Sequence, residues 1–167
     1  MDIYFAKSTN GGASFGTNVR VDDTGAGTSG QWCPAIAVDG SGNIHVVWHD
    51  YRSGNADIYY AKSTNGGASF GANVRVDDTG AGTSFQGYPA LAVDGSGNIY
   101  VVWHDTRNGN TDIYSAKSTN GGASFGANVR VDDTGAGTSQ QAYPALAVDG
   151  SGNIFAVWRD DRNGNYD

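Results

Sequence analysis

The chain has 167 residues and a net charge of −7, and its Lys and Arg residues are too few and too dispersed to form the basic surface that nucleic acids and anionic membranes require. No apolar run approaches the roughly 20 residues of a membrane-spanning helix, and the start of the chain lacks the regions of a secretory signal. A composition with 26 Gly and few helix-forming stretches favours short strands joined by tight turns, in a soluble all-β protein.

One sequence recurs along the chain with a period of 55 residues, so that Asp2, Asp57, Asp112 and Asp167 share one position. Such a period indicates a repeat architecture, in which each unit buries its apolar face against its neighbours. Because the copies are near-identical, sameness between them carries no functional information. Most of the differences gather in two loops, at Gly30/Phe85/Gln140, Trp32/Gly87/Ala142, Cys33/Tyr88/Tyr143, His49/His104/Arg159 and Tyr51/Thr106/Asp161.

Each copy contains four strand signals, described here for the second copy. The first strand, 89–93, is a short apolar run that ends at 94–98, where Gly and Asn residues tolerate the positive φ of a tight hairpin. The second strand, 99–103, is β-branched and aromatic without alternation, which is typical of a strand covered on both faces.

A polar loop, 105–110, leads to the third strand, 112–116. The fourth strand, 128–131, alternates apolar and polar residues, which suits an edge strand with one side in solvent. Four antiparallel strands in each repeat predict one blade of a β-propeller.

We therefore expect a single repeat domain in which the chain begins and ends within a blade. Residues 2–22 would supply strands three and four, 34–77 and 89–132 two whole blades, and 144–167 strands one and two. These three blade equivalents are too few for a closed ring, since propellers have roughly four to eight blades. Two chains joined head to tail give six, so we expect a homodimer; a partly unfolded monomer and larger rings are the alternatives.

The octet STNGGASF resembles the Asp-box of the sialidase-like, or BNR-repeat, family, with Asn where Asp is usual and Phe where Trp is commonest. The W-x-D-x-R segments that begin at Trp48, Trp103 and Trp158 strengthen this resemblance, which covers essentially the whole chain. In the family the Asp-box is a folding device between strands three and four, on the face opposite the binding site. Its counterparts here are Ser8, Asn10, Gly12 and Phe15; Ser63, Asn65, Gly67 and Phe70; and Ser118, Asn120, Gly122 and Phe125.

The resemblance implies a fold with six blades and, for the enzymes of the family, a site of three arginines, a tyrosine nucleophile assisted by Glu, and an Asp. This chain contains no Glu, and near-identical copies cannot readily supply different residues from different blades. We expect a self-assembling, non-catalytic propeller module. A sialidase-type glycoside hydrolase, or a fragment of one, is the alternative.

Two sets of residues are candidates for weak, multivalent glycan binding. Acid and arginine pairs follow the second strand, where they could hold sugar hydroxyls or could tie each loop to Asp57, Asp112 or Asp167. Amide and aromatic side chains precede the first strand, where they could hold a sugar ring or only plug the mouth of the channel. The candidates are Asp50, Arg52, Asp105, Arg107, Asp160 and Arg162, together with Gln31, Trp32, Gln86, Tyr88, Gln141 and Tyr143.

No cofactor or metal is expected. The turn at 94–98 has oxygen donors at alternating positions but lacks the later Glu of calcium loops, and the histidines His45, His49 and His104 lack partners at zinc-ligand spacing. Cys33 is alone, so no disulfide forms within the chain. The family resemblance implies an extracellular parent protein, and these boundaries are more typical of an excised or engineered piece than of a gene's own ends.

Overall fold

The computed structural model describes residues 1–164, and the regular elements within that range are all β-strands. They form four antiparallel sheets, which we name A to D in chain order. Sheet A consists of β1 (Tyr4–Phe5) and β2 (Val19–Arg20), and sheet B of β3 (Gln31–Val38), β4 (Ile44–Asp50), β5 (Asp57–Ser63) and β6 (Val74–Arg75). Sheet C consists of β7 (Gln86–Val93), β8 (Ile99–Asn108), β9 (Asn110–Ser118) and β10 (Val129–Arg130), and sheet D of β11 (Gln141–Val148) and β12 (Ile154–Asp160).

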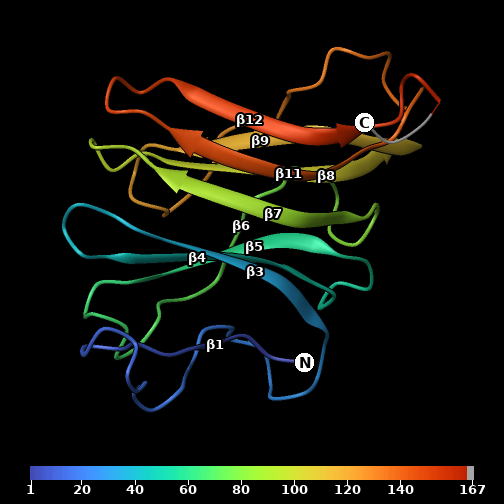
Figure 1. The fold of residues 1–167 in the computed structure, drawn as a ribbon. Coiled ribbons are helices and arrows are strands. Elements are labelled where there is room, and N and C mark those ends of the chain that lie inside the picture. Colours follow the sequence, from blue (N-terminus) through green and yellow to red (C-terminus); the bar gives the residue numbers. More distant parts are fainter. Residues whose placement is uncertain (165–167) are drawn as a thin grey trace.

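The sheets lie over one another in the order in which the chain makes them (Figure 1). The N-terminal sheet A is at one end of this stack and the C-terminal sheet D is at the other. Sheets B and C, between them, each have four strands in sequential antiparallel order. The all-β fold with four-stranded antiparallel sheets is thus confirmed. Among residues 1–164 there is no helix with the length and apolarity needed to cross a bilayer.

The second strand of each complete sheet is the centre of the core, as its continuous apolar run predicts. Every residue of β4 is buried, and so are the first seven residues of β8. The core between sheets B and C joins Val47 and Tyr60 of sheet B to Ile99 and Trp103 of sheet C. A second core, which contains Trp48, lies between sheets A and B. The tryptophans therefore pack sheet against sheet.

The first strand of each repeat begins three residues earlier than its sequence predicts. For example, β7 starts at Gln86 and not at Pro89. A β-bulge interrupts its pairing with β8 between Gly87 and Ala90, and inside the bulge Tyr88 has a φ of 52°. A bulge lets one strand carry extra residues past its partner, so the strand continues through a segment whose sequence resembles a loop.

The segment expected to be a polar loop in sheet C is a tight hairpin. Strand β8 runs on to Asn108 and β9 begins at Asn110, with Gly109 between them at a φ of 106°. In sheet B the same connection is longer, because β4 ends at Asp50 and β5 begins at Asp57. The fourth strand is shorter than expected, with only two paired residues in β10.

Candidate functional site

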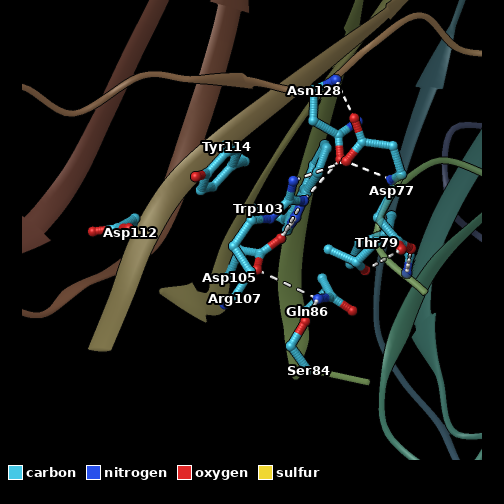
Figure 2. A network of polar contacts seen from close by, with 12 residues as sticks. Asp77, Thr79, Ser84, Gln86, Trp103, Asp105, Arg107, Asp112, Tyr114 and Asn128 are labelled. Atoms are coloured by element: carbon cyan, nitrogen blue, oxygen red, sulfur yellow. Dashed lines mark hydrogen bonds and ion pairs between the residues drawn. The ribbon is translucent and has the colours of Figure 1, made fainter. Parts of the chain in front are cut away.

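The three Asp-x-Arg pairs are occupied by contacts within the protein. Asp105 is fully buried and accepts hydrogen bonds from Trp103 Nε1 at 3.0 Å, from the Arg107 backbone N at 2.8 Å and from Arg107 Nη2 at 2.7 Å (Figure 2). Asp50 makes the same contacts with Trp48 and Arg52 in the first copy. The third copy repeats the ion pair, with Arg162 Nη2 2.6 Å from Asp160 Oδ2.

Each arginine also reaches the preceding sheet. Arg107 Nη1 donates at 2.8 Å to Oδ1 of Asp78, which follows the last strand of sheet B. Within sheet C, Nη2 donates to Asn128 Oδ1 at 2.8 Å, and the guanidinium lies 4.1 Å from the centre of the Tyr114 ring. Burial lowers the pKa of Arg107, but hydrogen bonds to Asp105 and Asp78 outweigh it and raise the pKa above its usual value. We call Arg107, Asp78 and Asn128, and their counterparts Arg52, Asp23 and Asn73, the inter-sheet latches. They hold the sheets together.

The expectation that these arginines hold Asp57 and Asp112 was wrong. Asp57 accepts a hydrogen bond from the Gly82 backbone N at 3.0 Å, and Asp112 accepts one from Gly137 N at 3.1 Å. Asp and Arg two residues apart project from the same side of the chain, so each arginine meets its own Asp and then the sheet behind it. Asp167 lies outside the described residues.

The three candidate glutamines point into the protein. Gln31, Gln86 and Gln141 are at most 2% exposed. The side-chain amide of each lies within hydrogen-bonding distance of a serine hydroxyl two residues earlier, as Gln86 does with Ser84 Oγ at 2.5 Å (Figure 2). These glutamines support the start of the first strand and are not positioned to contact a ligand.

The predicted aromatic residues, in contrast, come together. Trp32 and Tyr88 line one cavity of about 270 Å³, which we call the aromatic pocket; its other lining residues are Cys33, His49, Tyr51 and Phe85. Tyr143 lies beside it, with its ring centre 4.7 Å from that of Tyr88. Trp32 is 44% exposed and Tyr143 is 50% exposed, so both rings present a face to solvent.

The backbone beneath this pocket has an uncommon conformation. Cys33, Tyr88 and Tyr143 have φ values of 52°, 52° and 55°, which residues with a side chain adopt only at a cost. The same strain at the same place in three copies shows that it belongs to the repeat. It turns the side chain of each residue out of the first strand, toward the aromatic pocket and its neighbours.

Two histidines pack against Tyr88: His49, which lines the pocket, and His104, which is not one of its lining residues. The ring centre of His49 lies 5.8 Å from that of Tyr88, and the ring centre of His104 lies 4.7 Å from it. His104 is 6% exposed, and neither of its ring nitrogens has a hydrogen-bond partner among the described residues. The pKa of each histidine is lowered to about 4, mainly by burial. The charge of His49 also lowers the pKa of His104, whereas Asp50 raises the pKa of His49 and Asp105 raises the pKa of His104.

These histidines predict a loss of stability in mild acid. Because the folded protein holds their pKa below the unfolded value, the unfolded chain binds more protons as the pH falls from about 6.5 to about 4. We expect these two histidines to have no effect on stability above pH 7, and each to lower stability by on the order of 2 kcal/mol near pH 4.5. Urea denaturation at pH 7.0 and pH 4.5 measures this effect. A variant with His49→Phe and His104→Phe should lose much less, and an equal loss would contradict the assignment.

The STNGGASF octets form turns that are closed by their own side-chain hydrogen bonds. In the first copy Ser14 N donates to Asn10 Oδ1 at 3.0 Å, and Gly12 N donates to Ser8 Oγ at 2.9 Å. The same bonds recur in the second and third copies. The terminal aromatic residue packs on the preceding sheet, as Phe70 does on Phe5 with ring centres 5.5 Å apart.

Sequence reasoning missed four residues of the aromatic pocket, which are Cys33, His49, Tyr51 and Phe85. A signal for them was present, because these positions are among the few at which the copies differ. The histidines were considered only as metal ligands. Among residues 1–164 no group of His, Cys, Asp or Glu side chains is arranged to hold a metal ion.

The fold was compared with those of known proteins. The sequence matches no protein-family model and no curated protein. The structure is similar to a protein of unknown function from Dyadobacter fermentans, with a TM-score of 0.68 and 12% identity over 93% of this chain and 44% of that one. It is also similar to the Hadza microbial sialidase Hz136, with a TM-score of 0.55 and 15% identity over 81% of this chain and 36% of that one.

A third similar structure is an endo-arabinase from Bacteroides thetaiotaomicron, with a TM-score of 0.54 and 13% identity over 81% of this chain and 53% of that one. The chain has a β-propeller-like fold. Each sheet is therefore one blade or part of one. The chain spans about half the length of these proteins or less, and at such identity the likeness carries the fold alone.

Proposed function

We propose that this chain is a self-assembling, non-catalytic propeller module that holds a carbohydrate weakly in the aromatic pocket. The observation that carries the proposal is the contrast between two sets of side chains. The Asp-x-Arg pairs are engaged with one another, whereas Trp32 and Tyr143 leave ring faces in solvent. Aromatic faces with a few polar groups nearby are a common means of holding a sugar ring.

The polar groups of the pocket suit a hydroxyl-rich ligand. His49 lines the pocket and is neutral at pH 7, because its pKa is lowered to about 4. Its Nδ1 accepts a hydrogen bond from the Tyr88 backbone N at 3.4 Å, which leaves its Nε2 as a donor. The strained backbone at Tyr88 also supports a site here, because such strain tends to gather where ligands bind.

A sialidase-type hydrolase is the alternative, and the likeness of fold to a sialidase favours it. Acid and base catalysis needs carboxyl groups that reach the substrate. Asp50 and Asp105 are fully buried and bonded to tryptophan and arginine, and the chain has no Glu. We therefore expect no hydrolysis of a fluorogenic sialoside above the rate in buffer, and steady turnover would favour the hydrolase.

The carbohydrate site is tested by titration with sialyl, arabinan and xylan oligosaccharides, followed by two-dimensional NMR. We expect at least one of them to shift the backbone amides around Trp32 and Tyr88, with a Kd on the order of 1 mM. Trp32→Ala, which gives the first copy the residue of Ala142, should weaken binding about tenfold or more. Thr17→Ala, which gives the residue of Ala72, is the matched control and should bind as the unchanged protein does. Shifts that are absent or insensitive to Trp32→Ala would contradict the site.

A further inference from the structure

The two end sheets are open along edges that are paired in the complete sheets. In sheets B and C the second strand pairs with the third, as β4 does with β5. Strand β12 holds the place of a second strand and β1 that of a third, but each pairs with only one neighbour among the described residues. The open edges lie at opposite ends of the stack (Figure 1).

Residues that are buried inside sheets B and C are exposed on sheet D. Ile154 is 48% exposed, whereas Ile99 at the same place in the repeat is fully buried. Val157 is 67% exposed, whereas its counterpart Val102 is 2% exposed. Ile154 and Val157 lie on opposite faces of β12, so each face carries an apolar residue that is covered in the complete sheets and exposed here.

An apolar groove of about 430 Å³ lies between sheets C and D. Its lining residues include Val102, Val131, Leu146, Ile154, Ala156 and Trp158. Between sheets B and C the corresponding volume is closed by Ala116 of β9 and by Phe125, which pack in that core. Their counterparts in the repeat are Ala6 and Phe15.

We propose that a second copy of the chain places its residues 2–22 in this groove, with its β1 paired to β12 as one four-stranded blade. The register follows from β4 and β5, where Val47 lies opposite Tyr60 and His45 opposite Lys62. Accordingly Val157 lies opposite Phe5 of the second copy, and Phe155 lies opposite Lys7 of the second copy. This inference rests on the self-assembly in the proposed function and names its partner and its contacts.

Phe15 has no contact within its own chain that matches those of its counterparts. Phe70 packs on Phe5, and Phe125 packs on Tyr60 with ring centres 5.3 Å apart, but Phe15 is 66% exposed. The place of Phe5 and Tyr60 in the third copy is held by Ser115, which lines the groove. Phe15 of the second copy therefore lies over Ser115.

The inter-sheet latch at sheet D is also incomplete. In the first latch Asp23 N donates to Asn73 Oδ1 at 2.8 Å, and Asn73 N donates to Asp23 Oδ2 at 2.9 Å. The counterpart of Asp23 in the third copy is Asp133, whose side chain is 82% exposed although Arg162 already contacts it. The place of Asn73 in the next repeat is held by Asn18, which is exposed in its own chain. Asn18 of the second copy completes the latch.

Two copies close a ring. Each chain supplies two four-stranded sheets and two halves, or three blades, so two copies make six blades and three copies make nine. Propellers close with roughly four to eight blades. Only the pair falls within that range, and both of its junctions are the composite blade described above.

Cysteine cross-linking tests the register. In a Cys33→Tyr background, Lys7→Cys with Phe155→Cys places two exposed residues opposite one another, at the Cα separation that a disulfide accepts. The control replaces Phe155→Cys by Ala156→Cys, whose side chain points to the other face of β12. We expect a mass of two chains by light scattering, and covalent dimer on non-reducing gels for the first pair only. A mass of one chain, a larger assembly, or equal cross-linking by both pairs would overturn the proposal.

The contact of Phe15 gives a second measurement, which does not depend on cysteine chemistry. Ser115→Tyr provides the ring that Tyr60 provides elsewhere and should lower the dimer Kd about tenfold or more over two junctions. Phe15→Ala should raise the Kd and abolish that gain. The same gain with and without Phe15 would overturn the contact. Because these residues lie outside the aromatic pocket, carbohydrate titration of the same samples separates a failure of assembly from a failure of binding.

Discussion

Replacing Trp103 by alanine is expected to destabilise the protein by about 3–5 kcal/mol, which is usual for the removal of a large aromatic side chain from a core. Trp103 is fully buried between sheets B and C, and its indole N–H is bonded to Asp105. The substitution leaves a cavity between two sheets and removes a donor from a buried carboxylate. Urea denaturation, followed by far-ultraviolet circular dichroism at one protein concentration, gives the free energy of unfolding.

Trp32→Ala is the matched control for this prediction. It removes the same side chain from a site that is 44% exposed and at the rim of the aromatic pocket, so it should cost less than about 1 kcal/mol. A loss for Trp103→Ala no larger than that for Trp32→Ala would show that the interface between sheets B and C is not the main source of stability.

The architecture could be predicted because the sequence signal for each strand occurs again in every copy of the repeat. The unbroken β-branched and aromatic run that begins at Ile99 indicates a strand covered on both faces, and β8 is such a strand. The early start of β7 could not be predicted in the same way. It depends on a bulge in which Tyr88 takes a positive φ, and nothing in the composition of that segment distinguishes it from a loop.

The candidate site was predicted in part. The type of a residue indicates what chemistry it can perform, but not which way its side chain points in the fold. Trp32, Tyr88 and Tyr143 come together as the aromatic residues before the first strand suggest. Gln86 precedes Tyr88 by only two residues, but its side chain turns inward to Ser84. In a regular strand the two side chains would share a face, and the bulge with its positive φ at Tyr88 breaks that alternation. One partner of Arg107, Asp78, follows the last strand of the preceding sheet, so no local spacing could reveal it.

Asp105→Ala is expected to cost about 3–5 kcal/mol, because it removes the buried carboxylate of the ion pair and leaves Arg107 with only the half-exposed Asp78 as an anionic partner. The side chain of Asp105 is 0% exposed and that of Arg107 is 19% exposed, so water cannot readily replace the lost carboxylate. The substitution also removes the acceptor of the Trp103 indole N–H. Asp105→Asn keeps an acceptor oxygen and should fall between the alanine variant and the unchanged protein in urea denaturation.

Asp78→Ala tests whether burial, and not the mere presence of an ion pair, sets this cost. Asp78 binds the other side of the same guanidinium at 2.8 Å, but its side chain is 44% exposed. Water can take its place on Arg107, so the expected loss is about 1 kcal/mol or less. If Asp78→Ala and Asp105→Ala lost the same stability, the latch would act as one cooperative unit, and the arginine would be held by the preceding sheet as firmly as by its own strand.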